Sequence, residues 1–173
     1  EQPTPQADPV YAYSTAAGLR VMRGADPIVQ LPADQIGDAE WAADGSRFVA
    51  ATSKELVSID VRAGTVTKAP CTCSDIAIAA GKIFATKEYG SKEATVYDLA
   101  TLKMVGTNRF DLAVQRMDGA SDRLVTFQIT AEGARAWTDV VVIDPETGAR
   151  NKVGDAISPI DAAYTPRGWR GGP

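Results

Sequence analysis

The sequence predicts an all-β protein built from repeats. Three segments share one plan, an apolar β-branched run, an Asp, a turn of small residues and a second strand start: 56–66, 95–104 and 140–149. Elsewhere short runs rich in Val, Ile, Thr, Tyr and Phe alternate with Gly, Asp, Asn and Pro, and no window keeps apolar residues at helical spacing over three turns. Tandem repeats of this kind indicate a β-propeller or part of one.

Each repeat can be written as four strands, a to d. Strand a begins at an Asp and ends in a Gly turn, in the segments 38–45, 75–81, 111–119 and 161–168. Strand b follows that turn, strand c is the motif described above, and strand d continues from it. Strand a is rich in Ala, which suits the crowded innermost position of a propeller blade.

The repeats predict about three complete four-stranded blades, 38–70, 75–110 and 111–155, plus a split blade. An N-terminal set of strands b, c and d (10–14, 19–23, 28–31) and a C-terminal strand a (160–165) would form that blade from the two chain ends. The chain then closes as a four-bladed ring, forms half of a ring with a second copy, or is part of a larger propeller. Residues 1–9 read as a Pro-rich linker, and 10–173 as the propeller or half-propeller domain.

Composition limits the classes of partner. The 173 residues are 45% hydrophobic and 23% charged, with a net charge of −4, so no basic field is expected for nucleic acid or anionic lipid. No run of about 18 apolar residues occurs, so no direct membrane insertion is expected. Residue 1 is Glu and a Pro-rich stretch follows, which favours an extracytoplasmic domain, secreted or membrane-tethered by a lipid upstream. The alternative is a boundary inside a longer cytoplasmic protein.

Catalytic motifs are absent from the sequence. With no His, it excludes Ser-His-Asp and Cys-His catalysis and His-based metal sites. It also lacks a P-loop, a Gly-x-Ser-x-Gly elbow and a Gly-x-Gly-x-x-Gly loop. The carboxylates fall at turn positions and are expected to act as turn acceptors: Asp44, Asp60, Asp98, Asp118 and Asp144. We therefore expect no catalytic residues, cofactor or metal, which argues against an enzyme.

Cys71 and Cys73 are the two cysteines of the chain. They are two residues apart, so on an extended strand both thiols face the same side. The separation between them is near the upper limit for a disulfide. A disulfide there would close a small ring of the kind that is easily reduced. Two packed free thiols, or half of a soft-metal site, are the alternatives.

A binding face is expected from loop positions. In a propeller the b–c loops and the d–a crossings share one face, which would gather the following residues: Lys54, Cys71, Cys73, Tyr89, Lys92, Arg135 and Trp137. Trp137 and Arg135 would stand on an inserted loop at 130–137. An aromatic residue beside an Arg on such a loop is typical of a binding hot spot, and the alternative is that the two residues cap the blade edge. Trp41, within a strand a, is expected to pack in the core.

Two patterns resemble known propeller repeats. The segments around Asp60, Asp98 and Asp144 resemble the V-x-V-I-D-x-x-T-G-K-V unit of YVTN-type and quinoprotein-like propellers. The segment 42–48, Ala-Ala-Asp-Gly-Ser-Arg-Phe, resembles the F-S-P-D-G-K-x-L turn of WD40- and TolB-type blades. The resemblance spans roughly 36–168 and implies the fold, but WD40 Gly-His and Trp-Asp pairs are missing, so no partner carries over.

The sequence favours a non-catalytic binding or scaffold module of the cell envelope, because blades and loops are present and catalytic constellations are not. Its partner would be another protein, a second copy or the second half of a propeller. Two alternatives stay open. One is the propeller portion of an enzyme whose catalytic residues lie in a missing part or partner chain, and the other is a sensor or adaptor domain of a larger receptor.

Overall fold

The structure, a computed structural model, describes residues 8–32, 35–132, 135–156, 162–165 and 168–171. All regular elements in these ranges are β-strands, as predicted, and the described residues include no helix that could cross a membrane. The strands are β1 (Val10–Thr15), β2 (Gly18–Arg23), β3 (Asp26–Leu31), β4 (Ile36–Trp41), β5 (Arg47–Thr52), β6 (Glu55–Asp60), β7 (Val66–Pro70), β8 (Asp75–Ala79), β9 (Lys82–Thr86), β10 (Ser91–Asp98), β11 (Met104–Ala120), β12 (Arg123–Glu132), β13 (Arg135–Ile143), β14 (Arg150–Ala156), β15 (Ala162–Thr165) and β16 (Gly168–Gly171).

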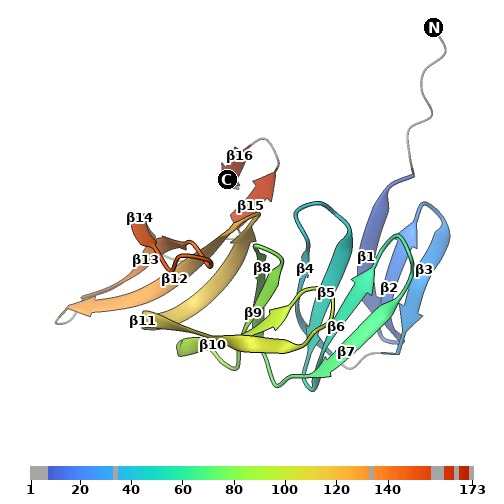
Figure 1. The fold of residues 1–173 in the computed structure, drawn as a ribbon, viewed down its shortest axis with the longest axis horizontal. Coiled ribbons are helices and arrows are strands. Elements are labelled where there is room, and N and C mark those ends of the chain that lie inside the picture. The colour runs from blue at the N-terminus through green and yellow to red at the C-terminus, as the bar shows by residue number, and fades with distance from the viewer. Residues whose placement is uncertain (1–7, 33–34, 133–134, 157–161, 166–167, 172–173) are drawn as a thin grey trace, which may run out of the picture.

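The strands form antiparallel sheets that follow one another along an arc, from β1–β3 on the right of Figure 1 to β12–β14 on the left. We call β1–β3 the N-terminal sheet and β4–β7 blade 1. Blade 2 consists of β8, β9, β10 and the first part of β11. Blade 3 consists of the second part of β11 with β12, β13 and β14. In each blade the inner strand, strand a of the repeat, is β4, β8 or the second part of β11.

Blades 2 and 3 share one continuous strand, which the sequence did not predict. Residues 104–109 of β11 pair with β10, and residues 114–120 pair with β12, so the two blades form one seven-stranded sheet. A register shift between Val114 and Arg116 marks a bulge in the pairing with β12. No Gly or Pro interrupts the chain from Phe110 to Arg116, so the strand continues through the crossing. The inner strand of blade 3 therefore begins near Val114, where its pairing with β12 starts, and the prediction that it begins at Asp111 is wrong.

The core lies between consecutive sheets. In β5, Phe48 packs toward the N-terminal sheet, whereas Val49 packs toward blade 2. In β8, Ile76 packs toward blade 1 and Ala77 toward blade 3. Successive side chains of a strand point to opposite faces, so strands in the middle of the arc are buried on both faces. This explains why they are continuous apolar runs rather than alternating ones.

The aspartates of the c–d turns act as predicted. One carboxylate oxygen of each accepts hydrogen bonds of 2.8–3.1 Å from the backbone amides two and three residues further on, at Asp60, Asp98 and Asp144. Asp44 accepts a similar bond from the Ser46 amide, at 2.9 Å. Asp118 does not belong to this set, which corrects the prediction. It is buried in β11 and forms an ion pair with Arg116 at 3.4 Å, because the inner strand of blade 3 runs through it.

The two chain ends form separate sheets. The described N-terminal strands pair in the order β1–β2–β3, and β15 pairs with β16 and contacts β11. Within one chain the expected split blade is therefore not assembled, because the arc holds its two ends apart (Figure 1). Pairing of these ends between two copies stays a prediction.

Candidate functional site

Carboxylates at the start of the inner strands join one blade to the next. Asp38 Oδ2 accepts a hydrogen bond from the Ile76 amide at 2.8 Å. Asp75 Oδ2 accepts the equivalent bond from the Met117 amide, also at 2.8 Å. The position that corresponds to Asp38 and Asp75 in blade 3 is therefore Arg116, one residue before Met117.

Glu40 lies deeper along the same inner strands. Its Oε2 accepts a hydrogen bond from the Ile78 amide at 2.7 Å, and its Oε1 accepts a longer one from the Gly119 amide at 3.4 Å. Burial raises the pKa of Glu40 from 4.5 to about 8, and repulsion from Asp118 and Asp38 adds to the rise, while the two amide bonds oppose it. The carboxyl group therefore keeps its proton at neutral pH.

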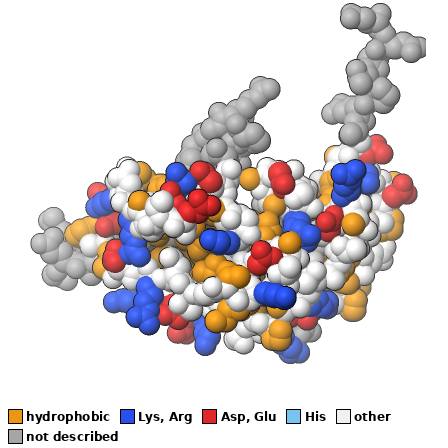
Figure 2. Space-filling model, viewed as in Figure 1, with side chains coloured by type: hydrophobic (Ala, Val, Ile, Leu, Met, Phe, Trp, Pro, Cys, Tyr) orange, Lys and Arg blue, Asp and Glu red, His pale blue; other side chains and the backbone are white. Residues whose placement is uncertain are grey.

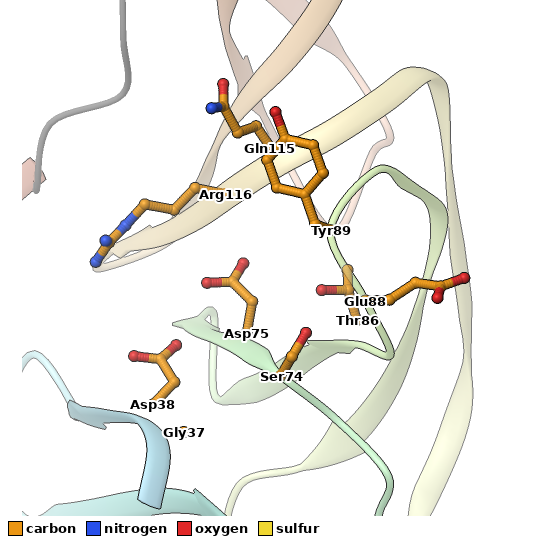
Figure 3. Close-up of a pocket in the computed structure, with 9 residues that line it drawn as sticks. All are labelled: Gly37, Asp38, Ser74, Asp75, Thr86, Glu88, Tyr89, Gln115 and Arg116. Carbon is orange, nitrogen blue, oxygen red and sulfur yellow. The ribbon is translucent and has the colours of Figure 1, made fainter.

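A polar cavity opens where the inner strands begin. It has a volume of about 390 Å³ and is lined by Gly37, Asp38, Ser74, Asp75, Thr86, Glu88, Tyr89, Gln115 and Arg116. We call it the inner-strand pocket. Figure 3 shows the carboxylates of Asp38 and Asp75 near the guanidinium of Arg116, whereas Glu88 points away.

The inner-strand pocket holds two carboxylates that repel each other. Burial raises the pKa of Asp75 from 3.8 to about 7, and the charge of Asp38 adds to the rise. The amide of Met117 and the charge of Arg116 act in the opposite direction. Asp38 and Asp75 thus share a guanidinium that is also paired with Asp118, and a further cation would relieve the repulsion between the two carboxylates.

Tyr89 gives the pocket an exposed aromatic rim. It follows β9 in the b–c loop of blade 2 and is 66% exposed. The loop is held by the Gly90 amide, which donates to the Val114 carbonyl at 2.9 Å, and by the Ser91 hydroxyl, which donates to the Glu88 carbonyl at 2.7 Å. A large ring on an anchored loop beside a polar cavity is typical of a residue that binds a partner.

A second cavity lies between blades 1 and 2. It also has a volume of about 390 Å³, and its lining consists of Lys54, Pro70, Cys71, Thr72, Cys73, Ala85, Lys87, Thr95 and Tyr97. We call it the disulfide pocket, because the structure joins Cys71 and Cys73 in a disulfide with their Cα atoms 5.4 Å apart. Both cysteines belong to the core between the two blades.

The structure brings part of the predicted binding face together. Lys54 lines the disulfide pocket with Cys71 and Cys73, and Tyr89 lines the inner-strand pocket. Lys92 is exposed on β10 and lines neither of these two cavities. The binding role of these residues stays a prediction.

The predicted inserted loop is instead an extension of two paired strands. β12 and β13 remain paired as far as Glu132 and Arg135, although residues 130–136 are mostly types such as Ala and Glu that are depleted in strands. Trp137 lies opposite Thr130 in that pairing, is half-buried, and donates its indole N–H to Asp139 at 2.8 Å. The side chain of Arg135 lies outside the described residues, so the predicted pairing of the two side chains is untested.

Several pocket residues were not singled out from the sequence as functional. The sequence pattern marks Asp38 and Asp75 only as the first residues of strand a. It gives no signal for Arg116, because the predicted third inner strand starts at the wrong residue. Glu40 offered a signal, since a Glu within an Ala-rich inner strand must be buried and must find a hydrogen-bond partner. Trp41 was wrongly expected in the core: it is 37% exposed and packs on Phe48 with ring centroids 4.9 Å apart.

Charges of both signs are mixed over the face shown in Figure 2, with apolar side chains between them. Among the residues that the structure describes, no group of three His, Cys, Asp or Glu side chains could hold a metal ion. The two cavities differ in the chemistry of their linings. The inner-strand pocket is rich in carboxylates, whereas the disulfide pocket holds two lysines and a disulfide.

No family model matches the chain, and no curated protein is similar to it in sequence. Solved structures are similar in fold. A structure of the mitotic checkpoint complex aligns with 14% identity and a TM-score of 0.60, over 92% of this chain and 53% of that one. The Pan2 WD40 domain of Neurospora crassa aligns with 9% identity and a TM-score of 0.57, over 87% and 47%. The dihydro-heme d1 dehydrogenase NirN in complex with DHE aligns with 12% identity and a TM-score of 0.55, over 91% and 46%.

The chain spans about half the length of these three structures. At such low identity the likeness concerns the fold alone. Together with the arc of four-stranded blades, it shows that this chain has the fold of part of a β-propeller.

Proposed function

We propose that this chain is a non-catalytic binding or scaffold module that holds a polypeptide partner at the inner-strand pocket. The observation that carries the proposal is Tyr89, an exposed aromatic ring on an anchored loop at the rim of a polar cavity. Tyr is one of the residue types enriched among the few that carry most of the binding energy of a protein interface. Gln115 and Ser74, also in the lining, offer hydrogen bonds to a peptide backbone.

The partner residue that enters the pocket is proposed to be Lys or Arg. Support comes from the repulsion between Asp38 and Asp75, which a positively charged side chain would reduce. Tyr89 can also stack against a guanidinium or ammonium group. A partner with an acidic residue at this position would be repelled.

The test starts with a photo-crosslinking amino acid at position 89, and at position 104 as control, because Met104 is equally exposed at 66% but lies on β11 away from the pocket. A protein captured from position 89 and not from position 104 is then purified, and its affinity is measured by calorimetry. We expect Tyr89→Ala to weaken binding by about tenfold or more, and Met104→Ala to leave it unchanged. Equal effects of the two substitutions would reject the pocket as the binding site.

The domain is further proposed to work outside the cytoplasm, secreted or tethered to a membrane by a lipid. The Cys71–Cys73 disulfide supports this, since disulfides persist mainly in oxidising compartments. Cell fractionation with thiol labelling tests the proposal. A reduced protein in the cytoplasmic fraction would reject it, and release by detergent alone would favour the tether.

A second copy, or the second half of a ring, is a further candidate partner, and one observation favours it. β1 is exposed along nearly its whole length, whereas β5 and β9, the second strands of blades 1 and 2, are almost fully buried. Those strands lie beside an inner strand, and no described strand lies on the open side of β1. A strand from a second copy, or from the second half of a ring, would pair with β1 and bury it.

A further inference from the structure

We propose that the disulfide pocket is a thiol–disulfide exchange site for small anionic thiols. This inference is independent of the binding function proposed above, because it concerns the other cavity. It rests on three features of that cavity: the position of the disulfide, the route to its sulfur atoms, and the charge of the lining.

The disulfide lies in the short link between β7 and β8, and its backbone is fixed on both sides. The Cys71 amide donates to the Lys54 carbonyl at 3.0 Å, and the Ser74 amide donates to the Thr86 carbonyl at 2.9 Å. The link can therefore stay in place while the bond between the two sulfurs opens and closes.

The cavity borders both cysteines of the disulfide. Cys71 and Cys73 are only 9% and 8% exposed, yet both line the disulfide pocket. A volume of about 390 Å³ falls within the range of pockets that hold small ligands. A small thiol that enters this cavity therefore meets both cysteines, and its contacts with the lining influence the rate.

The charge of the lining favours anions. Lys54 and Lys87 both line the cavity, and no Asp or Glu is among its lining residues. The Lys87 ammonium group attracts an anionic thiol and stabilises the thiolate that leaves when the disulfide opens. The inner-strand pocket, lined by Asp38, Asp75 and Glu88, has the opposite preference.

In this exchange the small thiol is the reductant of the Cys71–Cys73 disulfide. One thiolate attacks a cysteine sulfur, the bond between the two cysteine sulfurs breaks, and its electron pair leaves on the other cysteine as a thiolate. A second thiol then attacks the mixed disulfide, which releases the first cysteine and forms the disulfide of the small thiol. Two molecules of thiol are oxidised, and the protein disulfide gains two electrons and two protons. The reverse sequence oxidises the protein again.

The test compares glutathione, which is anionic, with cysteamine, which is cationic, at equal thiolate concentration on the purified full chain. Because the chain has two cysteines, any adduct detected by mass spectrometry is at this site. We expect glutathione to react faster than cysteamine, and added salt to narrow the difference. Equal rates for the two thiols would reject the charge argument.

Lys87→Gln gives the matched test, with Lys92→Gln as control, because both lysines are exposed and only Lys87 lines the cavity. We expect Lys87→Gln to slow the reaction with glutathione by about threefold to tenfold without slowing the reaction with cysteamine. Lys92→Gln should change neither rate. Equal effects of the two substitutions, or two free thiols in the untreated protein, would overturn the proposal.

Discussion

The Glu40 carboxyl group accepts a hydrogen bond from the Ile78 amide at 2.7 Å, and this bond joins the inner strand of blade 1 to that of blade 2. Two residues earlier, Asp38 makes the same kind of bond to Ile76. Apolar side chains fill the space between blades but are non-directional, whereas these bonds fix one inner strand against the next. These half-buried acids therefore set the register between blades and also make it sensitive to pH.

The first prediction concerns Glu40 and pH. Its pKa is 4.5 when the side chain is in water and about 8 in the fold. Between these values the unfolded chain loses the proton while the folded chain keeps it, so the free energy of unfolding falls as pH rises from 4.5 to 8. The contribution of Glu40 to that fall is at most about 5 kcal/mol, since one pKa unit corresponds to about 1.4 kcal/mol.

Glu40→Gln removes the ionisable group and keeps an oxygen that can accept from Ile78. We expect this variant to lose less stability than the wild type between pH 5 and pH 9, measured by urea unfolding. Glu146→Gln, an exposed residue in the c–d turn of blade 3, is the control and should follow the wild type. The same pH dependence in all three proteins would show that Glu40 is not buried as a neutral acid.

The second prediction concerns Gly119, where two inner strands approach closely. A Cβ atom at this position would overlap the Ile78 carbonyl oxygen, so Gly119→Ala must push the inner strands of blades 2 and 3 apart. We expect a loss of about 1–3 kcal/mol or more in the free energy of unfolding. Gly154→Ala on β14 is the control, since nothing lies within 4 Å of its added Cβ. If both variants unfold at the same urea concentration, the close approach is absent in solution.

The sequence could predict the parts of this fold that depend on local chemistry. The turns at Asp60 and Asp98 followed from the recurring Asp and the small residues after it, because an Asp acceptor and its turn are neighbours in the chain. The small residues of β8 likewise matched an inner strand.

The parts that depend on contacts between blades could not be predicted. The Asp-Gly pair at Asp118 is typical of a turn and predicts a turn acceptor, but Asp118 lies inside a long strand. The start of the third inner strand depends on the bulge near Val114, and nothing in the local sequence distinguishes that bulge from a strand end. The inner-strand pocket combines residues from three sheet segments, so it becomes visible only when the blades are placed beside each other.

The third prediction concerns Asp75 and the binding of a cationic peptide. At pH 8 the carboxyl is largely ionised, and as pH falls through its pKa of about 7 it takes up a proton and its attraction to a cation is lost. A Lys- or Arg-containing peptide selected on the pocket should therefore bind more weakly at pH 6 than at pH 8.

Asp75→Asn should bind that peptide weakly at both pH values, because it carries no charge to lose. Asp122→Asn, an exposed residue outside the pocket, is the control and should keep the pH dependence of the wild type. Fluorescence anisotropy with the labelled peptide measures all three proteins. A peptide affinity that rises toward pH 6 in the wild type would contradict the assignment of a cationic guest.

The last prediction concerns the open edge of β1. Tyr11 and Tyr13 on this strand are 41% and 38% exposed, and their rings stack with centroids 6.1 Å apart. Exposed edge strands pair readily with other chains, and a charge on the edge prevents this. We expect the chain to associate with a second copy as its concentration rises, measured by light scattering, and Tyr13→Lys to weaken that association. Val153→Lys on β14, 57% exposed in the wild type, is the control for an added charge elsewhere and should associate as the wild type does. If the wild type stays monomeric at all concentrations, β1 does not pair between copies and the ring is not completed by a second copy of this chain.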